Sequence, residues 1–523
     1  MLFKNLSLLF IGFGIFSNAC AQLDSNATKY ANEINEKDAQ KHLNILASDE
    51  FEGRDTGKPG GQKAAQYIAE EFKKLNLIAP VNNSYFQPVD LVESQFEVKN
   101  FTINGKDYKV TEGFFMTGSG DMNVINTDEI LFLGYGISND SYDDLQGFDI
   151  TGKVVLLINE SEPINKSGIS YITGTKKLSD WSTQRNKRLQ AILAKKPKLI
   201  IAASSEVDNV LKNFGSNLSK SRITLKDNFR AASNTIGVAH ITFDLADQLL
   251  NQSGTSLTQL KAEINKKGKP ATKILKAMLS ATYGTSVKPV KSQNVLGYLE
   301  GTDLKDELVV ISAHYDHVGI ENGEIYNGAD DDGSGTTAVL EMAKVFSKSK
   351  EEGNGPRRSI LFLTVTGEEK GLLGSDFYTR YPTFPLKNTV SDLNIDMIGR
   401  VDPEHKSNPN YIYLIGSDKL SSELHKISEE ANAQYTKLKL DYKFNDPNDP
   451  ERIYYRSDHY NFAKNGIPVI FYFNGVHEDY HKPSDTVEKI NFELLVKRTK
   501  LVFYTAWEIA NRDKRLVVDS NKR

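Results

Sequence analysis

Several apolar runs in the C-terminal half of this chain each end in a short cluster of histidine and carboxylate residues. The run at 308–312 is followed by His314, and the run at 360–365 is followed by Glu368 and Glu369. Continuous apolar runs of this length are typical of strands that are buried on both faces of a parallel sheet. In open α/β sheets, ligands bind outside the carboxyl ends of the strands. The pattern therefore predicts an α/β domain whose polar clusters meet at one edge of the sheet.

Three more polar residues follow the same rule. Asp396 ends the run at 390–395, His481 lies just beyond the run at 468–473, and Asp331 lies in a loop before a predicted helix. Buried charges are costly unless they are paired or hold a metal. Zinc accepts imidazole nitrogen and carboxylate oxygen as ligands. Any one of these motifs alone is more often an exposed turn, but their joint placement predicts a pair of zinc ions and hydrolytic chemistry.

Residues 477–481 also match the zinc motif H-E-x-x-H of another class of metalloprotease. That motif requires a helix, because only then do its two histidines share a face. Pro483 follows closely, and the flanking residues have no helical period of apolar positions. We therefore predict that the match is accidental. His317, His459 and His477 are expected to have structural roles or to support the ligands.

The bulk composition excludes some functions. The chain has 523 residues, 39% of them hydrophobic and 25% charged, with a formal net charge of -4. The length suggests about three domains, and no Lys/Arg-rich run indicates nucleic-acid binding. No segment after the first 21 residues reaches the ~20 apolar residues that a membrane span needs.

The first 21 residues are predicted to be an export signal. Lys4 precedes an apolar stretch at 8–16, and a small-x-small cleavage site ends at Ala21. The mature protein would then be periplasmic or extracellular. In the alternative interpretation Cys20 is a lipidated N-terminus that anchors the protein to a membrane. Cys20 is the only cysteine, so disulfides cannot stabilise the fold.

Two segments, 22–94 and 283–523, are predicted to form one discontinuous α/β domain, and 95–282 an insert. In the insert, short strand-like runs alternate with turns rich in Asn, Ser, Asp and Gly. Its sequence contains no cluster of metal-ligand residues, and His240 is its only histidine. We therefore place the chemistry outside the insert.

The polar motifs resemble those of a known enzyme family. They read SAHYDHVG at 312–319, GADDDGSG at 328–335 and TGEEKGLLGS at 366–375. They resemble the co-catalytic dizinc aminopeptidases, which are related to glutamate carboxypeptidase and glutaminyl cyclase. This resemblance implies a three-layer αβα sandwich with a mixed, largely parallel central sheet. The insert resembles a protease-associated (PA) domain, most clearly at 129–136 and 152–163.

The resemblance implies a ligand set for two Zn²⁺ per chain. Asp331 would bridge both metals. His314 and Asp396 would complete one zinc site, and Glu369 and His481 the other.

Further roles follow from the same resemblance. Glu368 would be the general base, and the carboxylate of Asp316 would orient the His314 imidazole, as such partners commonly do. Tyr480 would stabilise the oxyanion, although family members differ at this position. Family members often have a cis peptide after the bridging aspartate, so we expect one between Asp331 and Asp332.

The implied function is that of an exported zinc-dependent aminopeptidase. It would hydrolyse N-terminal residues from peptides through a metal-activated bridging water, with a Glu general base. A carboxypeptidase or dipeptidase of the same fold, or a glutaminyl cyclase, is an alternative. A further alternative is a non-catalytic protein that binds partners through the PA domain. The partners would be peptides with a free N-terminus. The sequence leaves the oligomeric state and the preferred N-terminal residue open.

Overall fold

The computed structural model describes residues 24–215, 218 and 220–520. The predicted export signal at 1–21, which includes Cys20, lies outside the described residues. Within the described part of the chain, no helix is both long enough and apolar enough to cross a membrane.

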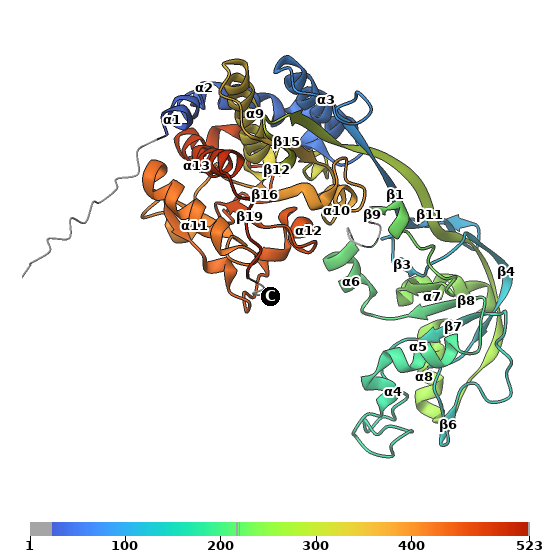
Figure 1. Cartoon of the computed structure of the whole chain (residues 1–523). Helices are drawn as coiled ribbons and strands as arrows, with labels where there is room; N and C mark the ends of the chain where they lie inside the picture. The colour runs from blue at the N-terminus through green and yellow to red at the C-terminus, as the bar shows by residue number, and fades with distance from the viewer. Residues whose placement is uncertain (1–23, 216–217, 219, 521–523) are drawn as a thin grey trace, which may run out of the picture. The chain divides into compact units, whose positions relative to one another are not determined.

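The chain divides into two compact units (Figure 1). The first unit contains the chain up to Val89 and from Ser292 onward, and the second unit is Asp90–Lys291. Strands β1 (Phe86–Ile103) and β11 (Lys273–Leu299) each begin in one unit and end in the other. The predicted insert at 95–282 falls within the second unit.

The first unit is built on a mixed, largely parallel sheet, as the sequence predicted. Its strand order is β18-β17-β19-β16-β12-β15-β11, with β11 contributing its C-terminal part. The pairs β12–β15, β12–β16, β16–β19 and β17–β18 are parallel, whereas β11–β15 and β17–β19 are antiparallel. The strands are β12 (Leu304–His314), β15 (Arg358–Val365), β16 (Thr389–Ile395), β17 (Tyr411–Ile415), β18 (Lys439–Asp441) and β19 (Val469–Phe473), and a separate hairpin pairs β13 (Gly319–Glu321) with β14 (Glu324–Tyr326).

Helices cover both faces of this sheet, which gives three layers. Successive strand residues point to opposite faces, so Val309 and Ile311 pack into one core cluster while Leu308 and Val310 pack into another. Because both faces are covered, every residue of β15, β16 and β19 is buried. One face carries α1 (Ser25–Ala31), α2 (Glu36–Leu46), α3 (Pro59–Lys74), α9 (Gly335–Glu351), α11 (Ser422–Ala431) and α13 (Phe492–Asn511), and the other carries α10 (Leu373–Arg380) and α12 (His459–Ala463).

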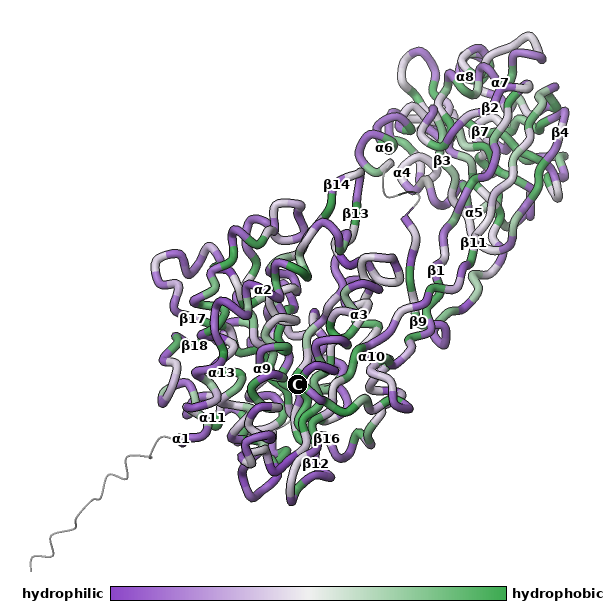
Figure 2. The backbone as a smooth tube through the Cα atoms, turned by 90° about the horizontal axis from the view of Figure 1, so that it is seen from above, coloured by the Kyte–Doolittle hydropathy of each residue, from purple (hydrophilic) through white to green (hydrophobic). Residues whose placement is uncertain are grey.

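The second unit has its own sheet and core. The strand order β11-β4-β7-β8-β10-β3 is parallel from β4 to β10, with antiparallel neighbours at both ends. Figure 2 shows hydrophobic segments inside each unit and hydrophilic ones in the loops. The PA-domain assignment remains a prediction. The elements are β2 (Lys106–Asp107), β3 (Phe114–Thr117), β4 (Asn123–Phe132), β5 (Ser138–Asn139), β6 (Tyr142–Asp143), β7 (Val154–Ile158), β8 (Leu199–Ala203), β9 (Arg222–Leu225), β10 (Val238–Ile241), α4 (Asp180–Thr183), α5 (Arg185–Leu193), α6 (Val207–Phe214), α7 (Phe243–Leu250) and α8 (Leu257–Lys267).

Phe362 tests the packing of the first unit. It is completely buried on β15, with its ring centroid 6.3 Å from those of Phe72 on α3 and Phe346 on α9. Phe362→Ala should lower the free energy of unfolding by about 3–5 kcal/mol, because it leaves a cavity in a packed core. Ile320→Ala, at a position 53% exposed on the β13–β14 hairpin, is the control and should change it by less than about 0.5 kcal/mol. Chemical denaturation measures both, and equal effects would contradict this packing.

Candidate metal centre

The five predicted ligands lie together at the carboxyl ends of the parallel strands. His314 is the last residue of β12, Asp396, Glu369 and His481 lie in the segments that follow β16, β15 and β19, and Asp331 precedes α9. The two oxygens of Asp331 face different partners. Oδ1 is 3.4 Å from His314 Nε2, and Oδ2 is 3.0 Å from His481 Nε2. His314 Nε2 also lies 3.6 Å from Asp396 Oδ1, and His481 Nε2 lies 3.1 Å from Glu369 Oε2.

Two donor groups result, and Asp331 belongs to both. In each group the ligand atoms all lie within 4.8 Å of one another. His314 Nε2 and His481 Nε2 are shielded from solvent, yet neither has a partner in hydrogen-bond geometry. Buried polar atoms normally have such a partner, so these nitrogens fit metal ligation. Group A is His314, Asp331 and Asp396, and group B is His317, Asp331, Glu369 and His481.

His317 is the residue that sequence reasoning placed least well. We expected a structural or supporting role, but its Nδ1 lies 2.8 Å from Glu369 Oε1 and 3.8 Å from Asp331 Oδ2. The ring is completely buried. The only sequence signal was a second histidine three residues after His314, and spacing alone cannot show where such a ring turns.

The charges of the site favour a cation. Burial raises the pKa of Glu368 and of Asp332 well above the ordinary carboxyl value, and nearby carboxylates raise both further. Burial alone would lower the pKa of His481, but the adjacent carboxylates of Asp331 and Glu369 raise it to about 10. Carboxylates therefore dominate the field, and divalent cations would offset it.

Asp316 does not act as the sequence predicted. The His314 ring meets its main-chain carbonyl, with Nδ1 3.0 Å from that oxygen. The nearer carboxylate oxygen is 3.9 Å from the same nitrogen. Instead, the carboxylate accepts hydrogen bonds from the Glu368 main-chain N–H at 3.1 Å and from the Thr56 hydroxyl at 2.8 Å. The predicted orientation of His314 by a carboxylate is therefore corrected to orientation by a carbonyl.

Glu368 and Tyr480 line a cavity beside the donor groups. Glu368 Oε2 lies 3.9 Å from His314 Nε2, whereas Glu369 turns to the other side and meets His317 and His481. Arg456 Nη2 donates to the Tyr480 phenol oxygen at 3.4 Å. Apart from these residues and the metal carboxylates, the lining is apolar. It consists of Met397, Ile453, Phe471, Phe473 and Val476.

The H-E-x-x-H match is accidental, as predicted. Residues 477–481 form loop and turn rather than helix. His477 Nε2 lies 3.2 Å from Asp330 Oδ2, while His481 turns to Asp331. The peptide bond between Asp331 and Asp332 is cis, which confirms the expectation.

Comparison with known proteins agrees with the motifs. A profile described as Peptidase family M28 matches residues 294–506. Two curated relatives are a probable leucine aminopeptidase of Trichophyton verrucosum and aminopeptidase YwaD of Bacillus subtilis. The first is 32% identical over 215 residues, covering 39% of this chain and 55% of the relative. The second is 28% identical over 272 residues, covering 50% and 51%.

The chain thus spans about half the length of the curated relatives it matches. Among solved structures, an aminopeptidase from Aneurinibacillus sp. strain AM-1 aligns with 94% of this chain and 98% of its own at 19% identity, with a TM-score of 0.49. The zinc aminopeptidase BSAP from Bacillus subtilis aligns with 92% and 98% at 19% identity, with a TM-score of 0.48.

An arginine outside the M28 segment supports the metal centre. Arg54 ends the 3-10 segment η1 (Asp49–Arg54) and is 1% exposed. Its guanidinium donates only to main-chain carbonyls, so it ties the end of β12 to the loop before α9. The five acceptors are Leu46, Tyr315, Asn327, Gly328 and Asp331.

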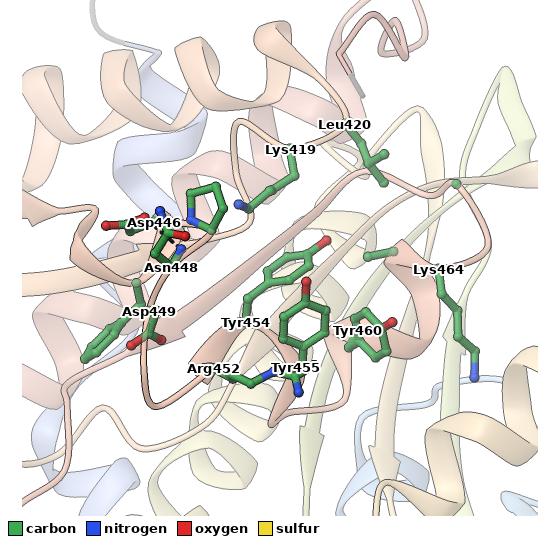
Figure 3. A pocket seen from close by; sticks show the side chains of 14 residues that line it. Lys419, Leu420, Asp446, Asn448, Asp449, Arg452, Tyr454, Tyr455, Tyr460 and Lys464 are labelled. Atoms are coloured by element: carbon green, nitrogen blue, oxygen red, sulfur yellow. Dashed lines mark hydrogen bonds between the residues drawn. The ribbon is translucent and has the colours of Figure 1, made fainter. Parts of the chain in front are cut away.

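A larger cavity of about 670 Å³ is lined by side chains that include Lys419, Tyr454 and Tyr455 (Figure 3). Both cavities are lined by residues of η10 (Ile453–Tyr455), since Ile453 lines the cavity beside the donor groups while Tyr454 and Tyr455 line the larger one. Lys419 lies with its ammonium 5.2 Å from the Tyr454 ring centroid. None of the predicted site residues lines this second cavity.

A substitution at Thr56 tests whether the N-terminal segment supports the metal centre. Thr56→Val removes the hydroxyl that Asp316 accepts from and leaves a buried carboxylate oxygen without that partner. Loss of such an outer contact typically lowers metal affinity or activity about 10–100-fold, and we expect an effect near the lower end. Thr56→Ser keeps the hydroxyl and is the matched control. Zinc affinity, measured by competition with a chromogenic chelator, should fall only for the valine variant.

Proposed function

We propose that this chain is a zinc-dependent aminopeptidase that removes N-terminal residues from peptides and is exported. One observation carries the proposal: the two oxygens of Asp331 face two separate donor groups, beside a cavity that Glu368 lines. Relatives whose names describe leucine aminopeptidases and zinc metalloproteases support it. The fit of imidazole and carboxylate donors to zinc supports two zinc ions per chain.

Groups A and B would each hold one zinc ion. Bound zinc would polarise the scissile carbonyl and lower the pKa of the attacking water. Asp331, as the shared carboxylate, would fix the spacing of the two positions. Its loop is held by Asp485, which accepts hydrogen bonds from the main-chain N–H groups of Asp330 and Asp331 at 3.0 and 3.2 Å.

Glu368 would be the general base. A base works best when its pKa lies near the working pH, and burial shifts the pKa of Glu368 upward in that direction. Its carboxylate takes a proton from the attacking water and then gives it to the leaving amine.

Tyr480 would donate a hydrogen bond to the developing oxyanion. Arg456 donates to the phenol oxygen, so the phenol hydrogen is free to point into the cavity. The positive α-amine of the substrate would bind near the carboxylates of Glu368 and Asp396, which line the same cavity. This pairing would limit cleavage to the first residue of a peptide.

The apolar cavity would select the first side chain. Aminoacyl-arylamides with Leu or Phe should be cleaved with higher kcat/KM than those with Glu or Lys, because the apolar wall of the cavity would bury an apolar side chain. Removing metal with a chelator should abolish hydrolysis, and added zinc should restore it. An N-acetylated substrate cleaved as fast as its free-amine counterpart would contradict the aminopeptidase proposal.

Arg456 favours a second candidate function, that of a dipeptidase. Its guanidinium borders the cavity and is suited to a substrate carboxylate. Parallel assays of Leu-Leu and Leu-Leu-amide separate the two functions. A dipeptidase would require the free carboxylate and lose that preference in Arg456→Gln, whereas an aminopeptidase would cleave both substrates.

The two adjacent glutamates should have separable roles. Glu368→Gln keeps the shape but cannot accept a proton, so it should retain bound zinc and lower kcat by at least about 10²–10⁴-fold, with little change in KM. Glu369→Gln should instead lose zinc from one site, and excess zinc should partly restore its activity. Metal content and kcat of both variants, measured together, decide the matter. Zinc loss in Glu368→Gln with retention in Glu369→Gln would reverse the assignment.

A further inference from the structure

Groups A and B differ in the number of donors that the protein supplies. Group A has three, whereas group B has four because of His317. We infer that His317 Nδ1 is a fourth protein ligand of the metal in group B, so that this site is closed by protein and group A keeps an open position. This inference rests on the proposed two-zinc function and assigns the two metals different tasks.

The four donor atoms of group B lie within 4.8 Å of one another, close enough to surround one ion. Zinc lies about 2.0–2.2 Å from nitrogen and oxygen ligands, which places the donor atoms of a tetrahedron about 3.3–3.6 Å apart. His317 Nδ1 lies 2.8 Å from Glu369 and 3.8 Å from Asp331, values on either side of that range. His481 Nε2 lies 3.0 and 3.1 Å from the same two carboxylates. One central ion would be within reach of all four.

The contact between His317 and Glu369 is not an ordinary hydrogen bond. A ring N–H that held Glu369 in place would point along the line to its oxygen. At 2.8 Å, neither His317 Nδ1 nor Glu369 Oε1 has a partner in hydrogen-bond geometry, and His317 Nε2 has none either. The two atoms are therefore close together without hydrogen-bond geometry, as two ligands of one ion can be.

The backbone fixes the ring in this position. Gly328 has φ +56°, and a Cβ there would lie 2.4 Å from His317 Cδ2 and 2.2 Å from the Asp331 carbonyl oxygen. Only a residue without a side chain lets the imidazole lie against this loop. The main-chain N–H of His317 donates to the Arg54 carbonyl at 3.3 Å, which fixes the backbone that carries the ring. The ring is thus held without help from a hydrogen bond of its own.

The difference in donor number predicts a division of labour. Structural zinc sites are closed by four protein ligands, whereas catalytic sites keep a position for water or substrate. Group B should therefore hold its metal more tightly and lose it last on dialysis against a chelator. Group A, beside Glu368, should be the site that exchanges metal and admits substrate.

A cysteine at position 317 gives a direct spectroscopic test. The full chain carrying Cys20→Ser, which removes its only natural cysteine, is the parent, and His317→Cys is loaded with Co²⁺ in place of zinc. A thiolate bound to Co²⁺ produces an intense near-ultraviolet charge-transfer absorption. We expect this band in His317→Cys. The matched control is His477→Cys, which changes another buried histidine near the site that belongs to neither donor group, and it should lack the band.

A His317→Cys protein that binds two Co²⁺ per chain without the band would overturn the inference. If that variant does not fold, His317→Gln is titrated with zinc instead. A fall of tenfold or more in the zinc affinity of the tighter site supports the inference. Unchanged zinc affinity at both sites overturns it. Neither readout uses hydrolysis. A charge-transfer band in a protein that cleaves no peptide would therefore reject the proposed function but keep the ligand.

Discussion

The structure of the site depends on one carboxylate that faces two ways. Asp331 can present its two oxygens to His314 and His481 only if its loop is rigid, since a small rotation would lose one of them. The loop is therefore held by two side chains. The Asp485 carboxylate accepts hydrogen bonds from two of its main-chain N–H groups, and the Arg54 guanidinium donates to two of its carbonyls. The sheet supplies the remaining order, because β12, β15 and β16 are parallel and bring their ends to one edge.

The strands and their polar ends could be predicted because both signals are local. A run buried on both faces is mostly apolar, and a ligand marks its end, as His314 does as the last residue of β12. Helix α3 could also be predicted, because Ala65, Ile68 and Phe72 recur with a helical period. All three are buried in the structure.

The contacts that were missed depend on side-chain direction or on distant parts of the chain. Whether His314 meets the carbonyl or the carboxylate of Asp316 is a matter of a few ångströms within one residue. The role of His317 depends on how its ring turns after a strand end. Arg54 and Thr56 act across more than 250 residues of sequence, and no periodicity or spacing links an arginine in a turn to carbonyls so far along the chain.

The place of Arg54 in the chain has a consequence for how this protein can be divided. The residues that match the M28 profile begin at 294, but the carbonyls of Asn327, Gly328 and Asp331 in the metal loop accept hydrogen bonds from Arg54, which lies 240 positions before that start. A fragment trimmed to the profile would contain every proposed zinc ligand and yet lack the buried cation that neighbours them. A fragment that keeps the metal loop in place should therefore include Arg54, and expression boundaries drawn from the profile match alone would remove it.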